Sequence, residues 1–297
     1  MLFLTPKLLG LAGALTVSAA ALGLEALLPI SERSGSELAT VQTAVLAPGS
    51  FIHPQPGEFL REGRPAVAPR ISVRIGEPLS IMTYQVSLDD YARCVSDGAC
   101  EPADSRGTGD APVTGVSYFD ATAYAAWYSE VTGEAWRLPT DEEWAFAAGE
   151  RFTADVEPLE DDPRNPARGW LSSYQREVDM ARKPDPKPRA RGAFGANAKG
   201  IGDMAGNVWE WTSSCYVRTT LSPHSSAIES AVENCGVHVV EGFHRTYMSN
   251  FIRDGKSGGC AVGLPPDNLG FRLVRDRSGL FGVSGIWSRL RSFLAVG

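Results

Sequence analysis

The segment from Gly200 to Trp211 carries the groups that could bind a cation. It contains carboxylates at Asp203 and Glu210, and Gly206 permits a tight turn between them. Hard cations such as Ca²⁺ bind to this mixture of carboxylate and main-chain oxygens. The segment lacks the ligand series of an EF-hand loop, so the alternative is a turn anchored in the core by its tryptophans. In that case Glu210 would accept hydrogen bonds from buried N–H groups or pair with an arginine.

A second set of polar side chains lies between residues 241 and 254. Its members are Glu241, His244, Arg245, Tyr247, Arg253 and Asp254. A histidine near a carboxylate and a phenol could bind a metal ion or transfer protons, which makes Glu241, His244 and Tyr247 the candidate catalytic residues. The alternative is a buried histidine that donates to a backbone carbonyl. No H-x-D or H-x-x-x-H spacing is present to predict an iron site from local sequence.

Cysteine usage is consistent with an exported protein. Cys94 and Cys100 enclose five residues that include a glycine, a spacing that fits a local disulfide formed in an oxidising compartment. The remaining cysteines are Cys215, Cys235 and Cys260, and spacing alone leaves their pairing open, Cys235 with Cys260 included.

The N-terminal segment predicts localisation to the cell envelope. Lys7 precedes seventeen apolar or small residues, and about 20 residues are needed to span a bilayer comfortably. We expect residues 1–30 to be an uncleaved signal anchor and residues 31–44 to be a linker, with the following domain on the periplasmic side of the inner membrane. The alternatives are cleavage, which would release the domain to the periplasm, and a buried N-terminal helix.

The C-terminal tail, residues 278–297, places apolar side chains at helical spacing together with arginines. This pattern predicts an amphipathic helix that lies on a membrane surface. Docking of the tail onto the domain or onto a partner is the alternative.

Composition limits the classes of function. The chain has 297 residues, of which 43% are hydrophobic and 21% are charged, so it can bury the core of a domain of about 230 residues. The net charge of −7 does not favour nucleic acid as a partner. The basic run at residues 182–191 is interrupted by prolines and indicates a solvated loop.

Local patterns predict several elements that must position these groups. Residues 71–75 alternate apolar and polar side chains as a half-buried strand does, whereas residues 159–193 show no period and predict a long loop. Helix starts are predicted from N-cap chemistry. They are Ser87 ahead of residues 88–95, Ser117 with Asp120 ahead of residues 121–128, and Thr140 with Glu143 ahead of residues 144–148.

Four sequence blocks, taken together and in this order, resemble the formylglycine-generating enzyme (sulfatase-modifying factor) family. They are Pro112-Val-Thr-Gly-Val-Ser-Tyr118, Trp136-Arg-Leu-Pro-Thr-Asp-Glu-Glu-Trp144, the segment 200–211, and Asn268-Leu-Gly-Phe-Arg-Leu273. The resemblance implies an irregular α+β fold related to C-type lectins, with little regular secondary structure, over residues 45–277. That fold carries oxidases, sulfoxide-forming enzymes and binding proteins, so function has to be argued from the site.

The resemblance also indicates which residues a copper centre of the family type would need in this chain. Copper-dependent members carry two cysteines, separated by four residues, ahead of the terminal Gly-Phe-Arg motif, and soft thiolates there select Cu(I). Counting back from that motif without gaps places His244 and Ser249 at these positions. We therefore do not expect this chain to form an aldehyde on a sulfatase cysteine.

Further site residues follow from the same resemblance. It implies a structural Ca²⁺ site formed by Asp203, Gly206, Val208 and Glu210. At the second cation site of the family the matching position is Arg168, which cannot bind a cation. The resemblance also implies a disulfide between Cys215 and Cys235 that closes a variable loop, residues 216–234.

Two hypotheses for function follow. In the first, the chain is a membrane-anchored, exported accessory factor that binds a partner protein during maturation or assembly. Its similarity to NirV-type proteins, encoded near copper nitrite reductases, suggests a denitrification context. In the alternative, the chain is a metal-dependent oxidase or oxygenase of the formylglycine-generating or ergothioneine type, with copper or iron in a rebuilt site at Glu241, His244 and Tyr247.

Overall fold

The elements that form the domain come from four stretches of the chain. The computed structural model describes residues 41–105, 107–153, 187–255 and 268–276, all of which belong to the unit that begins at Val41. The strands are β1 Thr43–Leu46, β2 Gly49–Pro54, β3 Glu58–Arg61, β4 Arg64–Pro65, β5 Arg70–Ile75, β6 Leu79–Met82, β7 Trp136–Arg137, β8 Trp209–Leu221, β9 Ile228–Glu241, β10 Thr246–Ser249, β11 Leu269–Gly270 and β12 Val274–Arg275. The helices are α1 Leu88–Ser96, α2 Tyr118–Thr132, α3 Asp141–Ala148 and a 3₁₀ turn at Gly149–Arg151.

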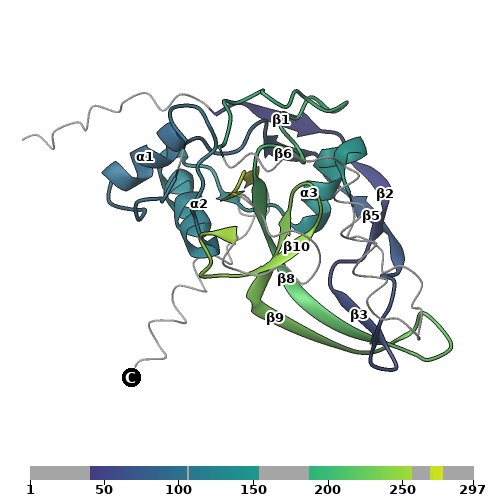
Figure 1. Cartoon of the computed structure of the whole chain (residues 1–297). Helices are drawn as coiled ribbons and strands as arrows, with labels where there is room; N and C mark the ends of the chain where they lie inside the picture. The colour runs from purple at the N-terminus through teal and green to yellow at the C-terminus, as the bar shows by residue number, and fades with distance from the viewer. Residues whose placement is uncertain (1–40, 106, 154–186, 256–267, 277–297) are drawn as a thin grey trace, which may run out of the picture. The chain divides into compact units, whose positions relative to one another are not determined.

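The strands form three small sheets, and short helices cover them (Figure 1). One sheet has the order β1-β6-β12-β7, and a second pairs β2 with β5. The third runs β10-β9-β8-β3-β4, with β11 paired to β8. This α+β architecture confirms the predicted fold class, and β5 confirms the strand expected at residues 71–75.

All three helices begin at the predicted N-caps. Ser87 accepts the hydrogen bond from the Asp90 N–H, and Ser117 and Thr140 each form a complete capping box. The caps satisfy N–H groups that would otherwise lack a partner in the first turn. Consequently α2 and α3 each begin three residues earlier than predicted, directly after the cap. Helix α2 ends at Gly133, whose φ of 69° lies in the left-handed region that glycine adopts without strain.

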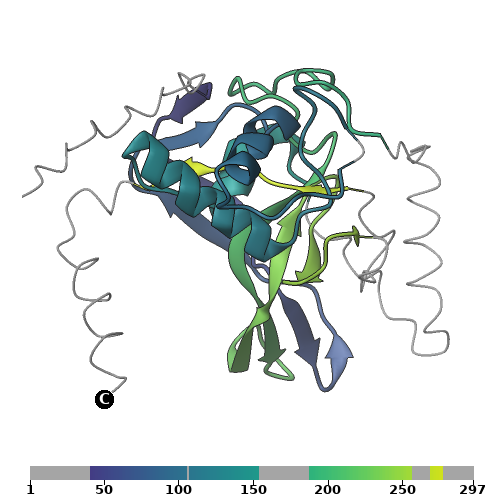
Figure 2. The ribbon, with the colours of Figure 1, turned by 90° about the vertical axis from the view of Figure 1, so that its left-hand side faces the viewer.

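The segment predicted as a variable loop, residues 216–234, is instead most of a long β-hairpin. Strand β8 has 13 residues and β9 has 14, and their register is continuous from Tyr216 to Thr220. The two strands carry β-branched residues here, Val217, Thr219, Thr220, Ile228 and Val232, which favour extended backbone. The tips of this hairpin and of β3–β4 point away from the helices (Figure 2). The prediction of a loop at these residues was therefore wrong.

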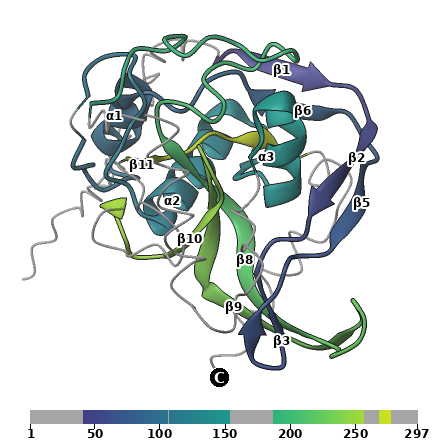
Figure 3. The same ribbon diagram turned by 45° about the vertical axis from the view of Figure 1, so that its right-hand side comes forward.

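Helix α3 lies between the β8–β9 pair and the β2–β5 pair (Figure 3). Trp144 on this helix is fully buried among apolar residues of the four-stranded sheet, such as Leu46, Ile81 and Val274. Among the described residues no helix is both long enough and apolar enough to cross a bilayer. The predicted anchor, the C-terminal tail, Arg168 and residues 159–186 of the predicted loop lie outside the described residues.

Candidate functional site

Two buried glutamates from the sequence-predicted sets lie side by side beneath α3. Glu210 on β8 is paired with Glu241 on β9 in the antiparallel ladder. Both side chains are fully buried. Residues directly opposite each other in such a ladder project from the same face of the sheet. The two carboxyl groups therefore need separate partners, and α3 supplies part of each set.

Glu210 accepts hydrogen bonds from four nitrogen atoms. Arg272 contributes its Nε at 2.6 Å and its Nη2 at 2.8 Å, a bidentate ion pair with no solvent exposure. The indole Nε1 of Trp144 lies 2.9 Å away, and the amide Nε2 of Gln85 lies 2.7 Å away. A buried carboxylate requires such a complete set of donors. This is the arrangement given above as the alternative to a cation site, in which Glu210 pairs with an arginine and buried N–H groups.

Glu241 is paired differently. Its Oε1 accepts from the Nε of Arg245 at 2.8 Å, whereas its buried Oε2 has no N–H donor. The carboxyl groups of Glu241 and Asp141 interact, and two interacting buried carboxyl groups favour the state in which one of them keeps its proton. Burial, together with the hydrogen bond and the charge of Asp141, raises the pKa of Glu241 well above its ordinary value. Of the two carboxyl groups, that of Glu241 is therefore the one that favours the protonated form.

Asp141, the first residue of α3, is the ionised member of this pair. Its Oδ2 lies 2.6 Å from the Nε2 of His53, and Arg245 donates to both of its oxygens at 3.1 Å. Burial alone would raise the pKa of Asp141, but Arg245 and the hydrogen bonds from Glu241 and His53 hold that pKa well below its usual range. We call His53, Asp141, Glu241 and Arg245 the buried charge cluster. All four side chains are buried, His53, Asp141 and Glu241 completely.

The sequence analysis did not identify two members of the buried charge cluster, His53 and Asp141. His53 is a lone histidine on β2, and no local spacing connects it to any other ligand-type residue. Asp141 is part of the sequence block at residues 136–144, where we considered the residues only as helix caps. No local signal sets Asp141 apart, because Glu142 and Glu143 follow it and acidic residues are common in the first turn of a helix.

The structure does not bring the three candidate catalytic residues to a common partner. Glu241 belongs to the buried charge cluster. The Nδ1 of His244 lies 2.8 Å from the carbonyl oxygen of Arg245, which matches the alternative of a histidine that donates to the backbone. The hydroxyl of Tyr247 accepts from the N–H of Gly57 at 2.8 Å. Each of these three side chains therefore makes a contact within the protein that stabilises the fold.

Polar groups of the turn at Asp203 also form hydrogen bonds within the protein. Asp203 accepts hydrogen bonds from the N–H groups of Gly192 and Phe194 at 2.7 and 2.8 Å. The carbonyl of Gly206 accepts from the N–H of Val208 at 2.8 Å. A calcium ion at Asp203, Gly206, Val208 and Glu210 would have to displace these donors and those of Glu210. Calcium binding at this turn stays a prediction, for which the described geometry shows no free set of ligand oxygens.

The backbone of this turn is strained. Asp203, Ala205 and Asn207 have φ values of 55°, 53° and 66°, in the region that non-glycine residues rarely adopt. The amide of Asn207 pairs with both the N–H and the carbonyl of Arg189, each at 2.8 Å. The side chains of Asp203 and Asn207 therefore hold the turn against the segment at residues 189–194.

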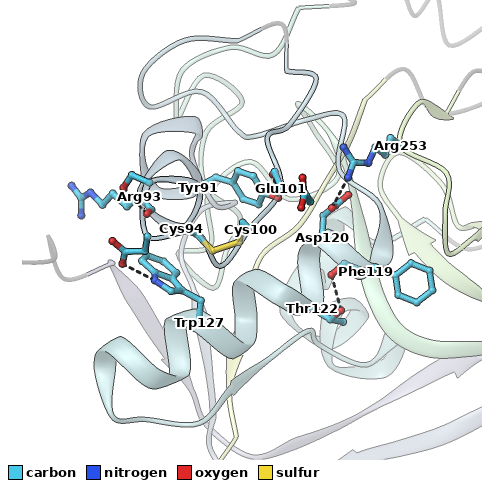
Figure 4. Close-up of a disulfide and its surroundings, with 12 residues drawn as sticks. Tyr91, Arg93, Cys94, Cys100, Glu101, Phe119, Asp120, Thr122, Trp127 and Arg253 are labelled. Atoms are coloured by element: carbon cyan, nitrogen blue, oxygen red, sulfur yellow. Dashed lines mark hydrogen bonds and ion pairs between the residues drawn. A yellow bond between two sulfur atoms is a disulfide. The ribbon is translucent and has the colours of Figure 1, made fainter.

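Both predicted disulfides are present. Cys94 is bonded to Cys100 between α1 and the residues that follow it (Figure 4), and Cys215 is bonded to Cys235 between β8 and β9. Cys94 is completely buried, whereas Cys235 is exposed. These pairings confirm the predictions for four of the five cysteines, and Cys260 lies outside the described residues.

Among the described residues, one group has the spacing of a metal site. It consists of Cys215, Glu233 and Cys235, whose ligand atoms lie within 4.8 Å of one another. The two sulfur atoms are bonded to each other, so in this oxidised state they cannot act as thiolate ligands.

Comparisons with known proteins agree with this architecture. A family model described as the sulfatase-modifying factor enzyme 1-like domain matches residues 33–277. The chain is 30% identical to the formylglycine-generating enzyme of Streptomyces coelicolor over 190 residues, which cover 59% of this chain and 55% of that enzyme. It is 37% identical over 107 residues to the inactive C-alpha-formylglycine-generating enzyme 2 of Bos taurus, covering 35% of this chain and 33% of that protein.

One further relative and one solved structure complete these comparisons. The chain is 37% identical over 111 residues to the hercynine oxygenase of Mycolicibacterium smegmatis, covering 36% of this chain and 22% of that enzyme. The solved structure of PvdO from Pseudomonas aeruginosa aligns with a TM-score of 0.47 at 21% identity, covering 79% of this chain and 94% of that one. The chain spans about half or less of the length of the curated relatives described here.

Proposed function

We propose that this chain, which belongs to the family of sulfatase-modifying factor enzyme 1-like domains, is an exported accessory protein that binds a partner protein during its maturation or assembly. In this proposal the domain does not oxidise a sulfatase cysteine to formylglycine. The shared family supplies the scaffold, and the difference in function lies in the side chains placed on it.

The state of the cysteines carries this proposal. Four of the five cysteines of the sequence form two disulfides, and Cys260 is the only cysteine that the sequence has besides these four. A Cu(I) centre of the family type needs two thiolates, because soft sulfur ligands select that ion. The chain offers no such pair unless a disulfide is first reduced. One of the relatives described above is itself named as an inactive formylglycine-generating enzyme.

The hydrogen bonding of the buried carboxylates also supports a structural role for these residues. Glu210 has four nitrogen donors, and Arg245 donates to both carboxyl groups of the buried charge cluster. Carboxylates with complete sets of protein partners stabilise a fold, whereas a catalytic acid or base must reach a substrate.

An exposed aromatic pair offers a surface for a partner. Phe119 is 58% exposed and Phe251 is 73% exposed. The N–H of Tyr118 donates to the carbonyl of Asn250, so the two segments that carry these phenylalanines are joined directly. Arg253 reaches across to Asp120 at 2.8 Å and fixes the loop beside α2 (Figure 4). Aromatic side chains of this kind dominate the core of protein–protein interfaces.

The proposal extends to location and context on the basis of the sequence. The apolar run at residues 8–24 would hold the domain at the periplasmic face of the inner membrane, and the amphipathic tail at residues 278–297 would add a second membrane contact. The resemblance to NirV-type proteins favours a partner in denitrification, such as a nitrite reductase.

Two measurements test the proposal. Protein exported through an oxidising compartment is incubated with Cu(I), oxygen and a cysteine-containing sulfatase peptide, and mass spectrometry follows the conversion of cysteine to aldehyde. We expect no conversion. Copper-dependent aldehyde formation that is lost in His244→Ala would overturn the proposal and favour the alternative of an oxidase with a rebuilt site.

The second measurement addresses partner binding directly. A photoactivatable amino acid is placed at Phe251 in cells, with Val232 of the hairpin, which is 65% exposed, as the matched control position. We expect a discrete cross-linked product with one exported protein from position 251, lost when Phe119 is replaced by Ala. Products that are the same from both positions would contradict a partner surface at the aromatic pair.

A further inference from the structure

An irregularity in the β8–β9 ladder gathers the ligand-type side chains of Cys215, Glu233 and Cys235, and His238 contacts Cys215 beside them. Cys215 is paired with His238, but the next residue, Tyr216, is paired with Asn234. Three residues of β9, 235–237, therefore stand opposite no residue of β8 and form a bulge. Bulges redirect side chains within a sheet, and this one turns Cys235 toward Cys215, to which it is bonded.

His238 is oriented toward the same disulfide. Its Nδ1 lies 2.6 Å from the Oδ1 of Asn250, and the amide of Asn250 is itself fixed because its Nδ2 donates to the carbonyl of Cys235. The Oδ1 can only accept, so Nδ1 carries the hydrogen and Nε2 carries the lone pair. That Nε2 lies 3.8 Å from the Sγ of Cys215.

The orientation of His238 is reinforced by stacking. The imidazole lies parallel to the ring of Tyr118, with centroids 3.7 Å apart and an interplanar angle of 16°. His238 is buried. A metal-binding histidine is held in this way, with its second nitrogen hydrogen-bonded to a neighbouring group that fixes the tautomer.

Glu233 completes the set from the solvent side. It lies two residues before Cys235 on β9, and a carboxylate oxygen is within 4.8 Å of both sulfur atoms. Glu233 and Cys235 are exposed, so both the disulfide and the carboxylate are accessible to small ions and reductants.

We propose that reduction of the Cys215–Cys235 disulfide opens a binding site for a thiophilic divalent cation of the zinc class, with Cys215, Cys235 and His238 as ligands and Glu233 as the fourth. Two thiolates, an imidazole and a carboxylate are the donors that tetrahedral zinc takes. The site would be closed in the oxidised protein and open in the reduced one. This inference is independent of the proposed partner-binding function.

The reduction step requires a dithiol, such as a protein of the thiol–disulfide exchange class. One of its thiolates attacks the exposed Sγ of Cys235, which breaks the Cys215–Cys235 bond and releases Cys215 as a thiolate. The second thiol of the reductant then attacks the mixed disulfide and releases Cys235. The reductant supplies two electrons and two protons and becomes a disulfide. Binding of the cation afterwards displaces the two thiol protons.

The distance between two of the proposed ligands, Cys215 and His238, already fits this site in the oxidised protein. Bonds of about 2.1 Å to nitrogen and about 2.3 Å to sulfur, at a tetrahedral angle, place the two ligand atoms roughly 3.5 Å apart. The distance between His238 Nε2 and Cys215 Sγ is 3.8 Å. Cys215 and His238 are therefore close to ligand spacing already, and a small movement of Cys235 away from Cys215 makes room for the ion.

The test uses the full chain with Cys260→Ser, so that the remaining thiol does not contribute. The protein is reduced with a phosphine reductant and titrated with Co²⁺, whose thiolate charge-transfer absorption reports sulfur ligands, and then with Zn²⁺ in competition. Circular dichroism checks that the reduced chain stays folded. We expect one equivalent of metal per reduced chain and none per oxidised chain.

The variants assign the ligands. We expect Cys215→Ser with Cys235→Ser to abolish the thiolate absorption, although Cys94 and Cys100 remain. His238→Ala should weaken binding by tenfold or more, and Asn250→Ala should weaken it 10- to 100-fold through loss of the histidine orientation. Equal affinity in His238→Ala, metal that follows the Cys94 thiols, or a reduced chain that unfolds without binding would each overturn the proposal.

Discussion

Asp141 and Trp144 lie three residues apart on α3, and each contacts a different member of a pair of opposed, buried glutamates. Trp144 donates to Glu210, and Asp141 shares a proton with Glu241. Residues at this spacing lie on the same face of a helix. Like charges opposite each other in a β-ladder are destabilising, and the structure removes that repulsion in two ways. Arg272 neutralises Glu210, and Glu241 keeps its proton.

The first prediction concerns the ion pair between Arg272 and Glu210. Replacing Arg272 by Ala leaves a carboxylate buried without its counter-charge, and we expect the free energy of unfolding in urea to fall by about 3–5 kcal/mol. Arg218→Ala is the matched control, because its ion pair with Glu58 is exposed and screened by water, so its loss should change the free energy of unfolding far less. A loss for Arg272→Ala as small as that of the control would contradict the role assigned to this pair.

The second prediction concerns the proton on Glu241. Because folding raises the pKa of this group above its ordinary value of 4.5, its contribution to stability is complete below that pH and is lost as the pH rises toward the folded-state pKa. Glu241→Gln keeps a donor for Asp141 but does not titrate. We expect the stability of the native chain, measured by urea unfolding from pH 4 to pH 8, to decline relative to Glu241→Gln as the pH rises.

The contribution of Asp141 to stability depends on pH in the opposite direction. Its folded-state pKa lies below its ordinary value of 3.8, so its contribution is present above that pH and is lost as the pH falls. Asp141→Asn should therefore remove stability chiefly at neutral pH and have less effect in acid. Stability curves for the native chain and Glu241→Gln that run parallel across the range would place the shared proton elsewhere.

The third prediction separates the two roles considered for Asp203. In Asp203→Asn an amide nitrogen would face the N–H of Gly192 or of Phe194, and we expect a loss of about 1–3 kcal/mol in unfolding free energy. The loss should be the same in calcium and in a chelator. If it appears only in calcium-containing buffer, Asp203 is a calcium ligand, as the sequence analysis predicted. Glu62→Gly, which changes an exposed residue with a φ of 50°, is the control for backbone strain.

The fourth prediction concerns the order in which the disulfides are reduced. Cys235 is exposed, whereas Cys94 is completely buried and Cys100 is 8% exposed. Reduction requires access of a thiolate to sulfur, so a mild reductant should open Cys215–Cys235 first. Timed alkylation followed by peptide mass spectrometry measures this order. Earlier labelling of Cys94 and Cys100 would show that accessibility in the folded state does not control the reaction.

Several features of this protein could be predicted from the sequence because they depend on neighbouring residues. The N-caps at Ser87, Ser117 and Thr140 act on N–H groups only three positions away. The Cys94–Cys100 disulfide joins residues six positions apart. The family blocks fixed the fold class and also led to the pairing of Cys215 with Cys235. The hairpin at residues 216–234 was missed because resemblance suggested a loop where valine and threonine favour strands.

The candidate site itself depended on tertiary structure. His53 and Arg245 meet Asp141 across 88 and 104 residues of sequence. Glu210 meets Arg272 across 62 residues. The sequence supplied the charged residues, and for Glu210 it even suggested an arginine partner. Which arginine neutralises which glutamate, and which carboxyl group keeps the proton, depend on burial and on distances of a few ångströms. Only the packing of α3 against β8 and β9 determines those quantities, because side-chain charge and pKa respond to their surroundings in space and not to spacing along the chain.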